Sequence, residues 1–163
     1  MAKYRFNLSP REIDKAIQIV QDYAADFRAK QDEFLRRLAE RGAEIAREEL
    51  QKMVYSNKNE NQTLQLLNSI TWGYDPEQKR GWVGTDLFYA KFVEFGTGPR
   101  GSRDRHPEAT DKWQYRQTPW VYYNDRVGHF LFTYGMPSRP FMYNTARRME
   151  SEAVRIAREV FGS

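Results

Sequence analysis

The chain has 163 residues, of which 40% are hydrophobic and 15% aromatic, with no cysteine and a formal net charge of +4. The length fits one domain over residues 1–163; the apolar content excludes a wholly disordered chain, and the lack of cysteine excludes a disulfide framework. The first residues contain no signal-peptide core and no apolar run reaches about 18 residues, so we expect an intracellular product with no membrane partner.

A long helix is predicted over residues 10–54. Ser9 can cap it, Pro10 suits the first helical position, and Glu12 completes a capping box. Apolar residues then recur every three or four positions, or at sums of these steps, at Ile13, Ile17, Val20, Ala24, Phe27, Phe34, Leu38 and Ile45. A continuous helix of this length would measure about 66 Å, against a diameter of roughly 40 Å for a compact domain of this size. We therefore expect the helix to bend, break or project, and a projecting apolar stripe would need a neighbouring subunit.

The segment that follows predicts a β-hairpin over residues 68–85. Ile70, Trp72 and Tyr74 alternate along its first half, which is typical of a strand with one covered face. A short helix is predicted next, over residues 87–95.

Two glycines mark the end of this short helix. Gly96 is expected in the left-handed conformation that terminates a helix, and Gly98 lies in the turn that prevents the helix from continuing. Glu94, just before them, either holds a basic partner or faces solvent, and the sequence does not decide between the two.

The rest of the chain predicts a polar loop at 99–117, a second hairpin at 118–134 and a helix at 138–161. Ser138 is expected to cap that helix, with Pro140 in its first turn. Together the elements predict an α+β fold: a long N-terminal helix, one antiparallel sheet of about four strands built from the two hairpins, a short middle helix, and a C-terminal helix packed on the sheet.

No catalytic, cofactor-binding or metal site is predicted, and we do not expect an enzyme. The two histidines, His106 and His129, lack the neighbouring ligands of a zinc site and are expected at the surface. The glycine-rich stretch 96–101 follows a helix and lacks the Gly-Lys-Ser/Thr ending of a phosphate-binding loop. An enzyme, for instance a nuclease, stays open as an alternative.

A nucleic-acid-binding protein is the other alternative. Aromatic residues of segment 113–123 follow Arg100, Arg103 and Arg105, a combination that could form a stacking platform for single strands. Residues 99–128, however, carry 6 Lys/Arg against 4 Asp/Glu, so acids dilute the basic excess. Packing within the protein is the preferred interpretation of the aromatic residues.

Two sequence blocks resemble a known family. Residues 89–98 read YAKFVEFGTG, and residues 135–142 read GMPSRPFM. Segments 68–70, 83–86 and 118–123 agree with the same pattern. In this order, and with a helix after the last block, they resemble the tail-completion or head–tail joining proteins of long-tailed bacteriophages.

The resemblance implies a structural subunit of the virion without catalysis or cofactor. Such proteins form a homo-oligomeric ring, which we expect to be hexameric, in the neck where head meets tail, after assembly in the host cytoplasm. The implied neighbours are neck or head-completion proteins and tail-tube or tail-terminator proteins. DNA would pass through the ring without sequence-specific binding.

The residues expected at subunit or partner interfaces come from two segments. The first set lies in the N-terminal part of the long helix, where its apolar residues extend beyond what one domain can cover. The second set lies in the polar loop, which matches the family pattern poorly. They are Ile13, Ile17, Val20 and Phe27 from the helix, and Arg100, Arg103, Arg105 and Trp113 from the loop.

Overall fold

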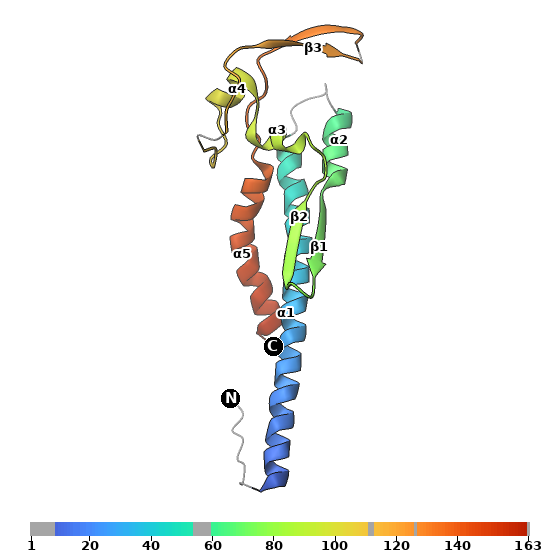
Figure 1. The fold of residues 1–163 in the computed structure, drawn as a ribbon, viewed down its shortest axis with the longest axis vertical. Helices are drawn as coiled ribbons and strands as arrows, with labels where there is room; N and C mark the ends of the chain where they lie inside the picture. Colours follow the sequence, from blue (N-terminus) through green and yellow to red (C-terminus); the bar gives the residue numbers. More distant parts are fainter. Residues whose placement is uncertain (1–8, 54–59, 111–112, 126, 163) are drawn as a thin grey trace.

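The computed structural model describes residues 9–53, 60–110, 113–125 and 127–162, which form an α+β fold (Figure 1). In chain order the elements are α1 (Pro10–Lys52), α2 (Glu60–Ser69), β1 (Thr71–Asp75), β2 (Arg80–Gly84), α3 (Ala90–Phe95), α4 (Gly98–Arg103), β3 (Trp120–Asn124), β4 (His129–Thr133) and α5 (Phe141–Phe161). Val54, the end of the first predicted helix, lies outside the described residues. Within the described segments, no helix combines the length and apolarity needed to span a bilayer.

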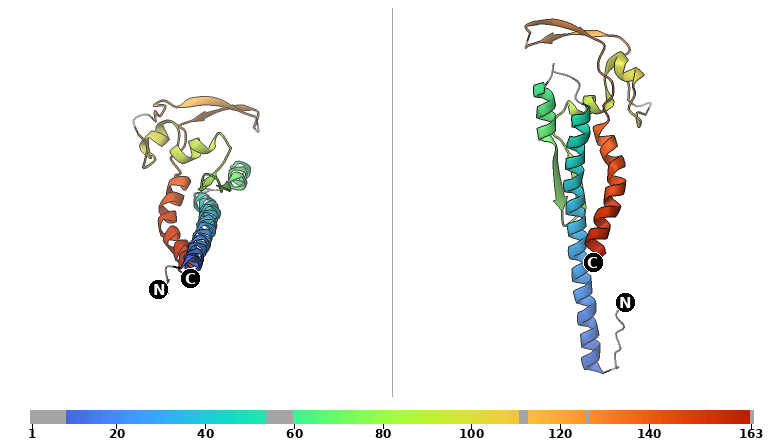
Figure 2. Two further views of the ribbon diagram at one scale, coloured as in Figure 1. Left: turned by 60° about the horizontal axis from the view of Figure 1, so that its bottom comes forward. Right: turned by 180° about the vertical axis from the view of Figure 1, so that it is seen from behind.

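The first helix, α1, is continuous over 43 residues. The Ser9 hydroxyl accepts a hydrogen bond from the backbone N–H of Glu12 at 3.3 Å, and Pro10 begins the helix. Gly42 does not interrupt it; its missing side chain makes room for Val83, whose Cγ2 would lie 2.9 Å from an added Cβ. We expected α1 to bend, break or project from the domain. It projects, because its N-terminal part extends beyond the other helices and strands (Figures 1 and 2).

The hydrophobic core lies along the C-terminal half of α1. Small residues on this half, including Ala43 and Ala46, allow other elements to approach closely. The buried residues packed around them are Leu50, Leu66, Ile70, Ala90 and Phe141. Burial of each large side chain among these contributes about 1.5–3 kcal/mol to the stability of the fold. The C-terminal half of α1 is therefore the element around which the core packs.

α5 lies alongside the same half of α1 (Figure 1). Arg148 of α5 forms ion pairs with Glu48 and Glu49 of α1 at 2.7 and 2.6 Å. At the far end of α5, Phe161 packs against Phe27 with ring centroids 5.8 Å apart. The helix pair therefore ends near Phe27, and no other described element accompanies α1 from there toward its N-terminus.

The first hairpin, β1–β2, packs against α1. Gly81 approaches the helix so closely that an added Cβ would lie 3.1 Å from the Leu35 carbonyl oxygen. Near the turn, Asp32 of α1 accepts hydrogen bonds from the Lys79 ammonium and the Tyr74 hydroxyl. These bonds, with that of Lys79 the stronger, lower the pKa of the Asp32 carboxyl.

The second hairpin, β3–β4, is a separate sheet. Val121 lies opposite Phe132 and Tyr123 opposite Phe130. In the described part of the chain, neither strand packs extensively on another helix or strand. The hairpin lies across the end of the molecule opposite the projecting part of α1 (Figures 1 and 2).

The expectation of one four-stranded sheet is therefore wrong, because the two hairpins form two two-stranded sheets. α1 packs against the first hairpin. The second hairpin lies away from it, because a bridge between Thr97 and Met136 holds its base next to α4. α5 packs mainly on α1 and meets the first hairpin where Met149 and Val83 both approach Gly42.

Several element boundaries also differ from the prediction. α2 includes positions 68 and 69, which the predicted hairpin includes. α4 begins at Gly98, in the predicted turn, and extends into the predicted loop 99–117. α5 begins at Phe141, so Ser138 does not cap it. The Ser138 hydroxyl instead donates to the Glu94 carbonyl oxygen at 2.6 Å, and the cap position belongs to Pro140.

Candidate interaction surfaces

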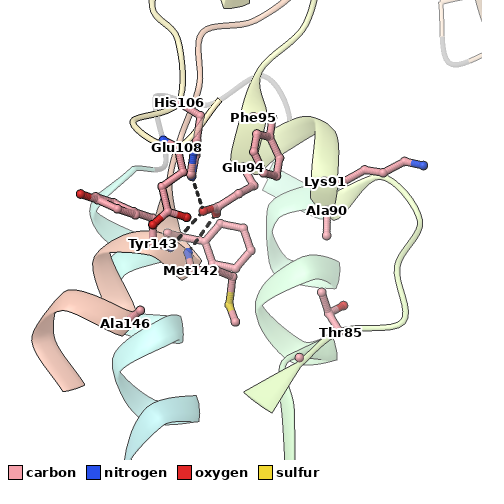
Figure 3. Close-up of a pocket in the computed structure, with 12 residues that line it drawn as sticks. Thr85, Ala90, Lys91, Glu94, Phe95, His106, Glu108, Met142, Tyr143 and Ala146 are labelled. Carbon is pink, nitrogen blue, oxygen red and sulfur yellow. Dashed lines mark hydrogen bonds and ion pairs between the residues drawn. The ribbon is translucent and has the colours of Figure 1, made fainter. Parts of the chain in front are cut away.

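Glu94 is the centre of a buried joint between α3, α5 and the loop after α4 (Figure 3). Its Oε1 accepts hydrogen bonds from His106 Nε2 at 2.9 Å and from the Tyr143 backbone N–H at 3.0 Å. Its Oε2 accepts from the Met142 backbone N–H at 2.9 Å. The first N–H groups of a helix have no partner within the helix, so Glu94 supplies the cap of α5 from a distant element and complements the helix dipole.

His106 is buried, with 4% of its surface exposed, so the expectation of a surface histidine is wrong at this position. Its ring packs against Phe95 and Tyr143, with centroid separations of 4.4 and 5.5 Å. The Glu108 backbone N–H donates to Nδ1 at 3.0 Å, which places the ring proton on Nε2 as donor to Glu94. The ring therefore acts as a neutral bridge between the loop and α3.

A cavity of about 430 Å³ lies beside this joint, and Thr85, Lys91 and Ala146 contribute to its wall (Figure 3). Both carboxylate oxygens of Glu94 are already engaged by donors from the chain itself. Across the described segments, no group of three or more His, Cys, Asp or Glu residues is placed to hold a metal ion. The hydrogen bonds of Glu94 therefore hold α3, α5 and the loop after α4 together.

Trp113, one of the expected interface residues, belongs in part to this joint. Its ring stacks on Phe95 with centroids 4.3 Å apart, and it remains half-buried. Tyr115 follows it and donates from its hydroxyl to the Phe95 carbonyl oxygen at 2.9 Å. These two rings pack within the protein, as the preferred interpretation of the aromatic segment predicts.

Gly96 and Gly98 connect the joint to the base of the second hairpin. Both have positive φ, at 76° and 62°. At Gly96, ψ is 172°, so this residue is extended rather than in the left-handed helical conformation. An added Cβ would lie 2.6 Å from the Ser138 nitrogen, because the chain leaving the hairpin passes directly over it.

The three expected interface arginines lie together around α4. Arg100, Arg103 and Arg105 are exposed, and the Arg105 guanidinium lies over the Tyr115 ring, 5.7 Å from its centroid. α4, which carries Arg100 and Arg103, lies at the same end of the molecule as the second hairpin (Figure 1).

The expected interface residues of α1 lie on its projecting part. Ile13, Ile17 and Val20 expose 45%, 50% and 66% of their surfaces. Phe27 is also half-exposed, although one side of its ring packs on Phe161. We call Ile13, Ile17 and Val20 the α1 stripe.

A second apolar surface was not anticipated from the sequence. Alternate residues of the second hairpin point to one side, and those on this side are Val121, Tyr123, Phe130, Phe132 and Tyr134, all exposed. We call these five the hairpin face. His129, at the start of β4, is exposed as expected. The alternation of aromatic residues at 130, 132 and 134 was the available signal, but alternation alone does not reveal which element covers a strand.

These features define an elongated α+β protein in which apolar side chains are exposed at both ends of the described chain. The sequence matches the family described as "Bacteriophage HK97-gp10, putative tail-component" over residues 14–96, just over half of the chain. The chain belongs to this family of phage tail components, which supports a structural role in the virion. The match includes the first of the two sequence blocks up to Gly96 and ends before the second hairpin. It begins at residue 14 and so also includes most of α1. No curated protein and no solved structure matches the chain.

Proposed function

We propose that this protein is a tail-completion subunit that forms a ring at the head–tail interface of a long-tailed phage. The ring is hexameric, with neck or head-completion proteins on one side and tail-tube or tail-terminator proteins on the other. Assembly takes place in the host cytoplasm, and the mature location is the virion neck. The protein acts without catalysis or cofactor.

The observation that carries this proposal is the α1 stripe, in a chain that belongs to a tail-component family. Three large aliphatic side chains in succession are exposed on a helix that extends past the core, where nothing in the described chain covers them. Such a surface is typical of a helix that packs against another subunit. A subunit of this shape is monomeric or weakly associated when free and becomes ordered against its neighbours on assembly.

DNA passes through the ring with weak and non-specific contact. Arg100, Arg103 and Arg105 can meet phosphates, but acids are interspersed with them, so few phosphates are neutralised together. Nanomolar binding to a duplex at physiological salt, with a steep salt dependence, would instead favour the alternative of a dedicated nucleic-acid-binding protein.

The test is a head–tail joining assay in extracts that lack the endogenous protein. Ile17→Glu and Val20→Glu should melt like the parent, because both side chains are exposed in the free subunit, yet fail to restore joining. A desolvated, unpaired charge in each subunit contact opposes assembly at every copy of the ring. Gln18→Glu introduces the same charge on the opposite side of the helix and should join normally.

Two outcomes contradict the proposal. If the Ile17 and Val20 variants join heads to tails at the parental rate, the stripe has no role in assembly. If they unfold, these residues belong to the core of the subunit.

A further inference from the structure

We propose that the hairpin face of one copy docks on the α1 stripe of the next copy, so that each subunit covers its neighbour's projecting helix. This inference rests on the proposed ring and names its contact. The occupant of the hairpin face is a second copy of this chain, and four features of the molecule support that choice.

The first feature is the composition of the two surfaces. The hairpin face consists of one aliphatic and four aromatic residues, and the α1 stripe of three aliphatic residues. Neither contains a charged side chain, so each can be buried without the desolvation of an ion. Phe130, at 70% exposed, and Val20, at 66%, are among the most exposed apolar residues of the chain.

The second feature is that the molecule already contains one contact of this type. The β1–β2 hairpin, with two strands of five residues, packs on the C-terminal half of α1. The β3–β4 hairpin has the same strand length, but among the described residues it does not pack extensively on a helix, and no described hairpin packs on the N-terminal part of α1. Each chain therefore carries one hairpin without a helix and one helical segment without a hairpin.

The third feature is that the two surfaces cannot meet within one chain. They lie at opposite ends of the long axis in each view of the molecule (Figures 1 and 2). A contact between unlike surfaces of identical copies is heterologous, and it generates a closed ring when the rotation between copies closes. A contact between the hairpin face and the α1 stripe can therefore generate the proposed ring. A two-fold contact between like surfaces would by itself generate only a dimer.

The fourth feature is the size of the hairpin face. Its five side chains expose on the order of 500 Å², since each aromatic residue buries at most about 150–250 Å². The α1 stripe exposes less, since it consists of three aliphatic side chains, so the contact buries at most about 1,000 Å² in total, the lower end of specific interfaces. A single contact is therefore weak, and a free subunit with little self-association is compatible with stable contacts in a closed ring.

The test uses cysteine pairs, which the absence of natural cysteine makes unambiguous. Copies that carry Ile17→Cys are mixed with copies that carry Phe130→Cys and treated with a short bis-maleimide linker. The mixed dimer should exceed, by at least about tenfold, the yield from Asp22→Cys with Phe130→Cys, because thiols held in contact have a raised effective concentration. Asp22 is exposed on the opposite side of α1 and provides the matched control.

Equal yields from the Ile17 and Asp22 pairs overturn the inference. Preferential linkage of Ile17→Cys to itself, or of Phe130→Cys to itself, overturns it as well and indicates contacts between like surfaces. The absence of all linkage even at high chain concentration assigns the hairpin face to a different protein. Each of these outcomes leaves the head–tail joining assay free to succeed, so failure of the contact and failure of the ring are distinguishable.

Discussion

The two hairpins have strands of equal length and similar apolar alternation, yet they occupy opposite environments. The first is half-buried against α1, and Val83 contributes to the core. The second exposes its aromatic face and is attached near its base, where Thr97 bridges to Met136 and the Arg100 backbone N–H donates to the Tyr134 carbonyl oxygen at 3.1 Å. An isolated two-stranded hairpin is marginally stable in water. The difference indicates that the first hairpin contributes to the stability of the subunit, whereas the second contributes little to its core and leaves exposed the face that we propose for contacts between copies.

The base of the second hairpin is where a substitution should have the largest effect. Gly96→Val should lower the free energy of unfolding by about 3 kcal/mol or more, because a β-branched residue disfavours positive φ and its Cβ meets backbone atoms. The nearest of these is the Ser138 nitrogen, which would lie 2.6 Å from the new Cβ. Denaturant unfolding provides the measurement. A midpoint equal to that of the parent would mean that the base can move without cost, and that the second hairpin is not fixed to the body.

Removal of the buried carboxylate beneath that base should have a slightly smaller effect. Glu94→Ala leaves His106 and two N–H groups of α5 without their acceptor, which should cost about 2–4 kcal/mol. Glu94→Gln keeps the shape and one oxygen acceptor and should cost about half as much. Equal stability of the alanine variant and the parent, measured in the same unfolding experiment, would show that water replaces the carboxylate.

A matched pair of valines compares the hairpins directly. Val83→Ala removes two methyl groups packed against the core and should cost about 1–2 kcal/mol. Val121→Ala removes the same groups from the exposed hairpin face and should change the stability of the free subunit by less than about 0.5 kcal/mol. In head–tail joining the order should reverse, with Val121→Ala the more defective of the two. Equal destabilisation by both substitutions would mean that the second hairpin packs within its own subunit.

Local signals of the sequence predicted α1, α3, α5 and the two hairpins, although not the helices α2 and α4. The cap at Ser9, the proline that follows it, and the turn at Gly96 each act within a few residues. The long stripe of α1 likewise indicated that the helix exceeds its own domain. These features are determined by residues that are close in sequence, so a single sequence is enough to predict them.

The features that the sequence did not predict depend on distant residues. The acceptors of the first N–H groups of α5 come from Glu94, 48 and 49 residues away. His106 is buried only because α3 and α5 enclose it. The separation of the hairpins has the same origin, since their alternating patterns are alike and only tertiary packing determines which one α1 covers.

The smallest predicted effect is a pH dependence of the contact between α1 and the first hairpin, which the second hairpin should not share. Asp32 of α1 holds the first hairpin through Lys79 and Tyr74, and the bonds that they donate keep its pKa below the ordinary value of 3.8. A carboxyl whose pKa is lowered on folding stabilises the fold above its unfolded pKa, and this contribution is lost as the pH falls through the folded pKa. The NMR resonances of the Tyr74 ring should therefore titrate with a midpoint below 3.8, and Asp32→Asn should abolish that titration. Ring resonances of Phe130 and Phe132 should not follow it, because neither strand of the second hairpin packs extensively on α1. A midpoint at or above 3.8, or the same titration in the asparagine variant, would show that Asp32 does not secure the first hairpin.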